Sequence, residues 1–393
     1  QILAKGIPEI LPSLTDTQYK LLDGVCLYIE LLLKNDEEIE AAKILTQLVS
    51  TAPQFPRVRA LQARLTARQG NPKEGKQIFN KALAIIKSNE SKNDQSLTAT
   101  YLSLGQAAQE LRVWLKAIEL YKKAFELSPQ ERHVRYYLGQ ALVRRAELHR
   151  LCEDLQVLYH TPGSDSINAS ARKTFQKALK TAYNDNPADP QLKKWLLRGE
   201  AVFSPNLENI AALEKLPPKN ENLAAYIGAL RLGRAKEKAL QIAIECSSSI
   251  KEKPILATQV AFSLMPTHPQ KAFRATQAAI NGNKKTNKLP TPLLEALKAM
   301  TAQNKGDNQT ARQAIHTALS YWDNEPRWHA LAGEVSETIQ ESIYYLQKAT
   351  KLEPKYPGHH LSLGKKYLEN GKTESAINAF QKITDLTNEH PEA

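Results

Sequence analysis

The residues most suggestive of chemistry form a short glycine–lysine stretch early in the chain. Gly70-Asn-Pro-Lys-Glu-Gly75-Lys76 matches the start of a phosphate-binding loop, in which backbone N–H groups and a lysine hold phosphates. That motif needs serine or threonine after the lysine to hold Mg²⁺, and Gln77 stands there instead. A strand should precede the loop, whereas helical spacing precedes Gly70. Nucleotide binding is therefore not expected, and the two glycines fit a turn and a helix contact.

Other residue types that support catalysis or metal binding occur without the spacing that such sites require. The H-E-x-x-H and G-x-S-x-G motifs are absent. The three cysteines lie too far apart in sequence for a zinc or disulfide motif, and we expect them to pack. The sequence therefore predicts no catalytic residues, no metal site and no cofactor. The residues considered and set aside are Cys26, Cys152, Cys246, His316, His329, His359 and His360.

Composition indicates a basic protein without a membrane span. Lysine and arginine exceed aspartate and glutamate to give a net charge of +12, which favours acidic partners or polyanions. The longest apolar stretch, Val25–Leu33, is interrupted by Glu30 and is shorter than a spanning helix. The chain starts with Gln1 rather than methionine, so we expect that an upstream segment has been removed.

The stretch Tyr101–Pro129 contains the pattern from which the rest of the chain can be interpreted. Leu104-Gly105 begins it, and Ala117, Tyr121 and Ala124 follow at i, i+4 and i+7, on one stripe of a helix that Pro129 ends. Two helices fit the stretch, with a break near Arg112–Val113. Small residues occur where the two helix axes would approach closely.

These residues and spacings resemble the tetratricopeptide repeat (TPR), a 34-residue helix pair. The same triplet of small and apolar residues, at positions i, i+4 and i+7, recurs along the chain, and we call each triplet a repeat mark. The distances from Ala41 to Gly75 and from Ser342 to Ala376 are both 34 residues. The resemblance implies an all-α, right-handed superhelical solenoid of about ten antiparallel helix pairs, several of them divergent. The marks are Ala41/Leu45/Leu48, Gly75/Phe79/Ala82, Ala171/Phe175/Ala178, Ala239/Ala243/Cys246, Ala272/Thr276/Ala279, Ala311/Ile315/Ala318, Ser342/Leu346/Ala349 and Ala376/Phe380/Ile383.

The regularity of the marks predicts three parts. An N-terminal array covers residues 1–186, a divergent helical region 187–290, and C-terminal repeats 291–393. The first array carries an insertion near 148–169, where helical apolar spacing predicts a first helix running on to about Tyr159. This insertion is either a tolerated extra loop or an element that grips a partner. Ile280–Pro292 is expected to be a basic polar linker.

In proteins that this chain resembles, the first helix of every pair lines the concave side of the superhelix. For this chain, the resemblance implies a groove lined by arginine, glutamine and tyrosine side chains. The arginine guanidinium groups could bind a carboxylate or a phosphate, and the side-chain amides could pair with peptide amides. The alternative is that exposed arginines on a helix are an ordinary solvated face. The partner-binding candidates are Arg57, Arg64 and Arg68, then Gln106, then Tyr136, Gln140 and Arg144.

Three functions remain open. The first is a non-enzymatic scaffold or adaptor that binds a protein or peptide segment, which the basic charge predicts to be acidic. The second is binding of a polyanion, either nucleic acid or acidic glycan, although no base-by-base code repeats in the groove. The third is the repeat region of a larger enzyme or sensor protein. Family members that clamp chaperone tails carry Gly-Asn, whereas Gln106 and Gln140 follow the glycines here, so such a clamp is not expected.

Overall fold

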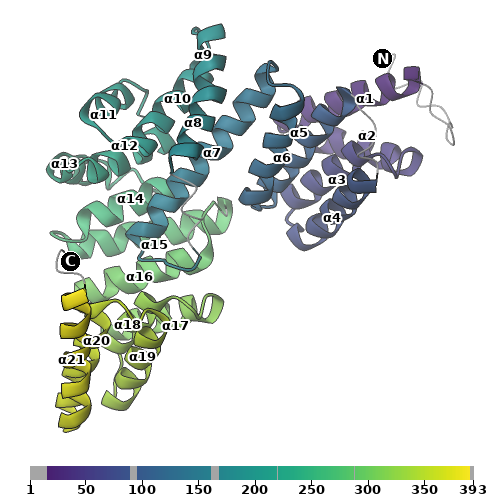
Figure 1. Ribbon diagram of the computed structural model, residues 1–393. Coiled ribbons are helices and arrows are strands. Elements are labelled where there is room, and N and C mark those ends of the chain that lie inside the picture. The colour runs from purple at the N-terminus through teal and green to yellow at the C-terminus, as the bar shows by residue number, and fades with distance from the viewer. Residues whose placement is uncertain (1–15, 89–94, 161–167, 219, 287, 390–393) are drawn as a thin grey trace. The chain divides into compact units, whose positions relative to one another are not determined.

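A computed structural model describes residues 16–88, 95–160, 168–218, 220–286 and 288–389 (Figure 1). Helices and turns account for these residues, and no β-strand occurs among them. None of the described helices is both long and apolar enough to cross a membrane. The chain folds into two compact units. Unit 1 comprises Gln1–Arg145 and Lys173–Leu192, and unit 2 comprises Ala146–Arg172 and Lys193–Ala393. The three-part division expected from the sequence stays a prediction.

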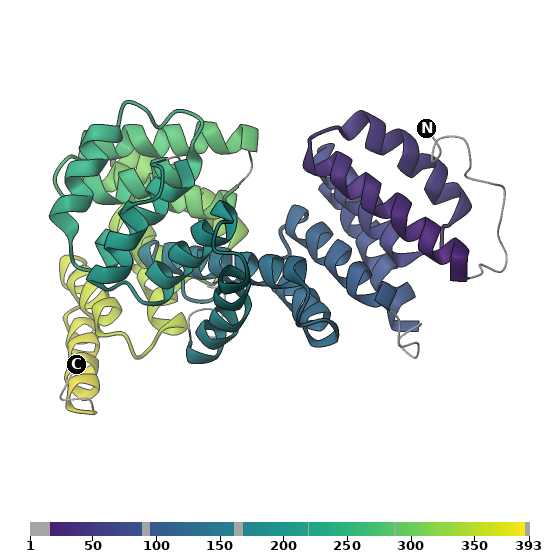
Figure 2. The same ribbon diagram turned by 90° about the horizontal axis from the view of Figure 1, so that it is seen from above.

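Unit 1 is built from helix pairs that follow one another in chain order (Figures 1 and 2). In the first two pairs, the first helix packs on its own second helix and on the first helix of the next pair. The pairs are α1 (Asp16–Lys34) with α2 (Glu38–Thr51), α3 (Pro56–Arg68) with α4 (Pro72–Ser88) and α5 (Gln95–Glu110) with α6 (Trp114–Leu127). Most of α7 (Arg132–Asp154) and the succession α8 (Ala169–Phe175), η2 (Gln176–Lys180) and α9 (Thr181–Asp185) complete the unit.

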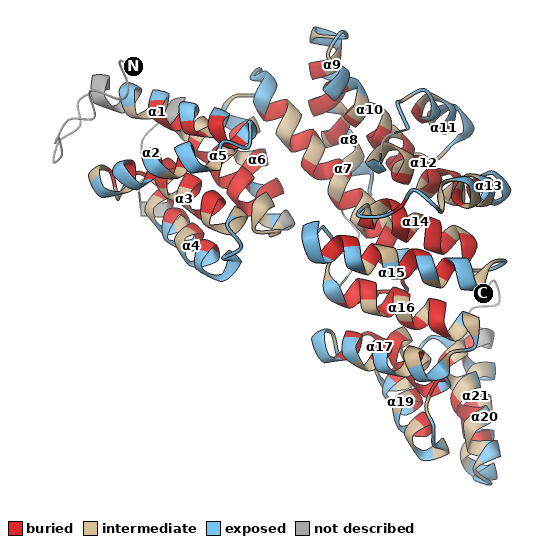
Figure 3. Ribbon diagram, turned by 180° about the vertical axis from the view of Figure 1, so that it is seen from behind, coloured by how far each residue is buried: buried red, intermediate tan, exposed pale blue. Residues whose placement is uncertain are grey.

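Unit 2 continues the same pairwise packing. Its largest apolar cluster joins successive pairs, and α14 is buried around much of its surface (Figure 3). Its helices are α10 (Pro190–Phe203), α11 (Leu207–Glu214), α12 (Asn220–Leu232), α13 (Lys236–Cys246), α14 (Pro254–Leu264), α15 (Pro269–Thr286), α16 (Thr291–Lys305), α17 (Asn308–Tyr321), α18 (Pro326–Glu334), α19 (Ile339–Leu352), α20 (Pro357–Glu369) and α21 (Thr373–Glu389).

The small residues of the repeat marks lie where the helices of a pair cross. Ala117 and Ala124 on α6 are fully buried, as the sequence predicts. Gly105 on α5 lies against the ring of Tyr121, and a Cβ atom added there would come 2.3 Å from that ring. Gly364 on α20 has the same relation to Phe380 on α21, at 2.4 Å. The Leu-Gly motif therefore marks the close approach of two helices.

Two expected boundaries are wrong. Helix α7 ends at Asp154 rather than near Tyr159, because Gln156 adopts a left-handed conformation with φ 57° and Val157 N–H bonds back to the Cys152 carbonyl. The basic segment expected to be a linker begins inside a helix, since α15 continues through Lys284 and Lys285 to Thr286. Lysines in the last turn of a helix interact favourably with its dipole.

The contact between Gly105 and Tyr121 predicts a difference between two glycine replacements. Gly105→Ala should lower the free energy of unfolding by about 1–3 kcal/mol, because the added methyl group overpacks the helix crossing. Gly24→Ala is the matched control, since Gly24 lies within α1 and an added Cβ would meet nothing within 4 Å. That change should be neutral or stabilise by up to about 1 kcal/mol through helix propensity. Urea unfolding of both variants tests this; equal effects would contradict the assigned packing.

Candidate partner-binding face

Three first helices of unit 1, α3, α5 and α7, carry the residues that the sequence marks for partner binding. We call this surface the first-helix face of unit 1, formed by α1, α3, α5 and α7. On α3, Arg57, Arg64 and Arg68 are separated by seven and four residues, which places them on one side of the helix. Side-chain hydrogen bonds from these arginines reach α1 on one side and α5 on the other. Polar side chains therefore connect α1, α3 and α5 across this face.

Arg57 is held by two carboxylates from α1. Its guanidinium contacts Asp23 Oδ1 at 3.1 Å and Glu30 Oε1 at 3.2 Å, and its side chain is only 6% exposed. Ser103 on α5 joins the group by donating to Glu30. Burial by itself would lower the pKa of Arg57, but Glu30, Cys26 and Asp23 raise it, and the net shift is upward. The cation is thus neutralised within the protein.

Arg64 and Arg68 bridge α3 and α5. Arg64 Nη1 donates to Gln106 Oε1 at 2.7 Å, and Arg68 Nε donates to Glu110 Oε1 at 2.9 Å. Arg68 also donates to the Leu33 carbonyl at the end of α1, at 2.6 Å. The structure therefore brings together two residues predicted to line the groove, Arg64 and Gln106, and they bind each other.

The α7 side of the face is aromatic. Gln140 Nε2 lies 3.3 Å from the Tyr136 hydroxyl, and the Tyr136 and Tyr137 rings meet edge to face with centroids 5.3 Å apart. Tyr137 stacks in turn on Tyr121, at 5.9 Å. Burial raises the pKa of Tyr121 well above its usual value, and Tyr137 adds to the shift, whereas Arg64 and Arg144 oppose it. Tyr136, Gln140 and Arg144 are all partly exposed.

Sequence reasoning missed the acidic partners of the arginines. Asp23 and Glu30 are seven residues apart on α1, as Arg57 and Arg64 are on α3. Both carboxylates contact Arg57, however, so the equal intervals do not correspond to the pairing and no local spacing indicated it. Whether the seven candidate residues bind a partner stays a prediction.

The described residues do not support a metal or thiol site. No group of three or more histidine, cysteine, aspartate or glutamate side chains is placed among them to hold a metal ion. Burial raises the pKa of Cys26 and of Cys152 to about 12, so these thiols stay protonated near neutral pH. Both pack in apolar clusters, as the sequence predicts.

Comparison with known proteins supports the fold assignment. Human IFIT1 in the structure of its dimer with PPP-AAAA is similar over 95% of this chain and 96% of that chain, with a TM-score of 0.50 and 14% identity. The chain has a TPR-like fold. No protein-family model matches it, and no curated protein does.

Two further structures show weaker likeness. MamA from Desulfovibrio magneticus RS-1 covers 44% of this chain and 94% of its own, with 19% identity and a TM-score of 0.37. The APC/C hetero-tetramer Cut9-Hcn1 matches over 95% of this chain and 88% of the other, with 14% identity and a TM-score of 0.40.

The carboxylates around Arg57 predict a coupled stability effect. Arg57→Met should lower the free energy of unfolding by about 3 kcal/mol, because it leaves Asp23 and Glu30 beside each other without their cation. The double variant Arg57→Met, Glu30→Leu should recover more than about 1 kcal/mol of that loss, since it no longer leaves the Glu30 carboxylate partly buried without a cation. A double-mutant cycle from urea unfolding measures the coupling. Additive losses would show that the pair does not stabilise the fold.

Proposed function

We propose that this protein is a non-enzymatic scaffold or adaptor that binds a partner polypeptide on the first-helix face of unit 1. The observation that carries the proposal is the row of side chains on α7. His133, Tyr136, Gln140 and Arg144 follow at intervals of three and four residues, so they share one helix face, and each is exposed or partly exposed. Tyrosine supplies rigid contact area, glutamine can pair with peptide amides, and arginine can hold a carboxylate.

An acidic segment is the partner that this face and the whole chain favour. The protein carries a net charge of +12, which attracts anionic partners over distance. Arg57, Arg64 and Arg68 already have acidic or amide partners on α1 and α5, so their role is to hold α3 against these two helices. Direct contact then falls to Tyr136, Gln140 and Arg144.

Polyanion binding is the second candidate. The net charge favours it, and the human IFIT1 structures that share the fold include a complex with PPP-AAAA. Nucleic acid binding would depend on phosphate contacts and would respond strongly to salt.

Peptide selection on the immobilised 393-residue chain tests the proposed face. Peptides enriched by the wild-type protein should be acidic, and Tyr136→Ala with Gln140→Ala should weaken their binding at least about tenfold, about 1.4 kcal/mol. Tyr321→Ala is the matched control, because Tyr321 is an exposed tyrosine on α17 in unit 2, outside the proposed face. Its affinity should match the wild type. Selected peptides that bind the double variant as tightly as the wild type would exclude this face.

Titration at two salt concentrations separates the two candidate functions. A selected acidic peptide and a single-stranded oligonucleotide of equal charge are compared on the wild-type chain. For nucleic acid the logarithm of the binding constant should fall linearly with the logarithm of salt, by about 0.7 for each phosphate contacted. For the peptide, most of the affinity should remain at high salt because tyrosine and glutamine contacts are not screened. Tighter, steeply salt-dependent oligonucleotide binding would favour the polyanion function.

A further inference from the structure

The end of α7 and the residues after it behave differently from the other helix connections. We call residues 151–160 the internal segment. In the pair α5–α6, the residues between the two helices are 111–113, whereas after α7 the next helix begins only at Ala169. The internal segment belongs to unit 2 and packs within it. Residues 151–154 of the segment are the last turn of α7, and residues 155–160 follow it.

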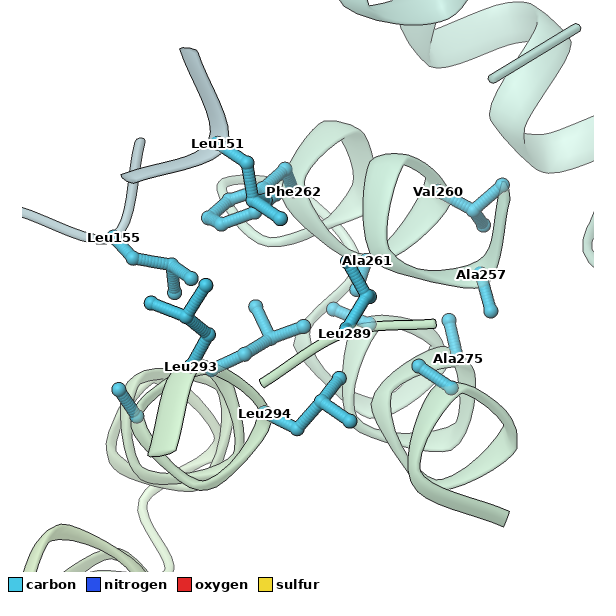
Figure 4. Packing of buried hydrophobic residues seen from close by; sticks show 14 of the residues in the cluster. Leu151, Leu155, Ala257, Val260, Ala261, Phe262, Ala275, Leu289, Leu293 and Leu294 are labelled. Atoms are coloured by element: carbon cyan, nitrogen blue, oxygen red, sulfur yellow. The ribbon is translucent and has the colours of Figure 1, made fainter. Parts of the chain in front are cut away.

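Apolar side chains of the internal segment enter the main cluster of unit 2. Leu151, Leu155 and Val157 are 5%, 1% and 6% exposed within it. Figure 4 shows Leu151 directed toward Phe262 on α14 and Leu155 directed toward Leu293 on α16. Both α14 and α16 are first helices of their pairs. The segment therefore lies on the first-helix side of unit 2, which in TPR proteins is the concave side.

Polar contacts hold the same segment at two further first helices. Arg231 on α12 donates two hydrogen bonds to the Asp154 carboxylate, at 2.8 and 3.0 Å. Trp328 on α18 donates its indole N–H to the Leu155 carbonyl at 3.0 Å. One short segment thus contacts four successive first helices, in the order α12, α14, α16 and α18.

A buried carboxylate holds the last residues of the segment. Glu325, which is fully buried, accepts backbone N–H groups from Tyr159 at 3.0 Å and His160 at 2.7 Å, and also from Leu158. The His160 ring stacks on Trp322 with centroids 4.4 Å apart. Consecutive backbone N–H groups are therefore paired with a side chain of the repeat array, as they are when a protein binds a peptide.

The internal segment has the pattern of a bound ligand. Its inward side chains give way to outward ones at the end, since Val157 is buried whereas Leu158 and Tyr159 are 43% and 50% exposed. The receiving helices contribute side chains to these contacts, and residues 155–160 lie beyond the end of α7 at Asp154. Releasing residues 155–160 would therefore interrupt no helix, whereas releasing the whole segment would also detach the last turn of α7.

We propose that the first-helix face of unit 2 is a peptide-binding groove that the chain keeps closed with its own residues 151–160. The external segment it fits has the same chemistry: an acidic residue that pairs with Arg231, a leucine next to it, and an apolar residue two positions further on. This inference concerns unit 2 and is independent of the face proposed on unit 1. A covalently linked ligand competes at high effective concentration, so an external segment binds only when the internal one is released.

Peptide binding in trans tests the groove. The probe is a fluorescein-labelled synthetic peptide with the sequence of residues 147–160, in which serine replaces the cysteine. The release variant is the full chain with Leu151→Ser and Leu155→Ser. These changes weaken the binding of the internal segment to the groove and alter no residue of the groove itself. Fluorescence anisotropy should show saturable 1:1 binding to the release variant and at least tenfold weaker binding to the wild type. A folded release variant that does not bind the probe would overturn the proposal.

Groove variants supply the matched controls. Glu325→Gln and Trp328→Phe, each added to the release variant, should weaken probe binding at least tenfold. The first removes the negative charge and replaces one of the two acceptor oxygens by an NH2 donor, and the second removes the donor to the leucine carbonyl. A probe with Asp154→Asn should also bind more weakly, since it loses the charge that pairs with Arg231. Equal binding by these variants, or by a scrambled probe, would mean that attachment is non-specific and would overturn the proposal.

Hydrogen exchange on the wild-type chain tests the same inference if the release variant does not fold. A segment that can leave its groove should open locally, so the amides of Leu158, Tyr159 and His160 should exchange at least tenfold faster than those of α14 and α16. Exchange of all these amides at one common rate would show that the segment opens only with the whole unit. The segment would then be a permanent brace, and the groove proposal would be wrong.

Discussion

The close approach of two helices within each pair is the constraint on which the rest of the structure depends. A helix pair in this fold cannot cover its own apolar face, so stability comes from stacking one pair on the next. Stacking at short distance requires that one helix present almost no side chain where the other crosses it. Gly105 under Tyr121 and Gly364 under Phe380 meet this requirement. With the pairs so placed, the first helices become neighbours, and their side chains form continuous faces.

On unit 1 the first-helix face is organised by charge. Acidic residues on α1 and α5 enclose the arginines of α3, so cations that look available in the sequence are ion-paired in the structure. Such pairs compensate the cost of partial burial and favour one register between helices. On α7, the partly exposed side chains of Tyr136 and Gln140 lie close to the stacked rings of Tyr137 and Tyr121.

On unit 2 the corresponding face is already covered. The connection after α7 is longer than the turn of another pair, and the last turn of α7 together with the residues that follow it packs onto four first helices. Glu325 is the clearest mark of this arrangement, because a fully buried carboxylate is stable only when its oxygens accept hydrogen bonds. One repeated architecture thus presents an open polar face in one unit and an occupied apolar face in the other.

Local sequence determined the helix pairs, since the spacing of small and apolar residues is a property of each 34-residue stretch. It predicted the break near Arg112 and the burial of Ala117 and Ala124, and both are confirmed. Tertiary structure decided the partners of each charged residue and the course of the insertion. Arg57 binds Glu30 at a sequence separation of 27 positions, and Glu325 binds His160 at a separation of 165 positions. No local periodicity encodes such contacts, because they arise only when helices distant in sequence are stacked side by side.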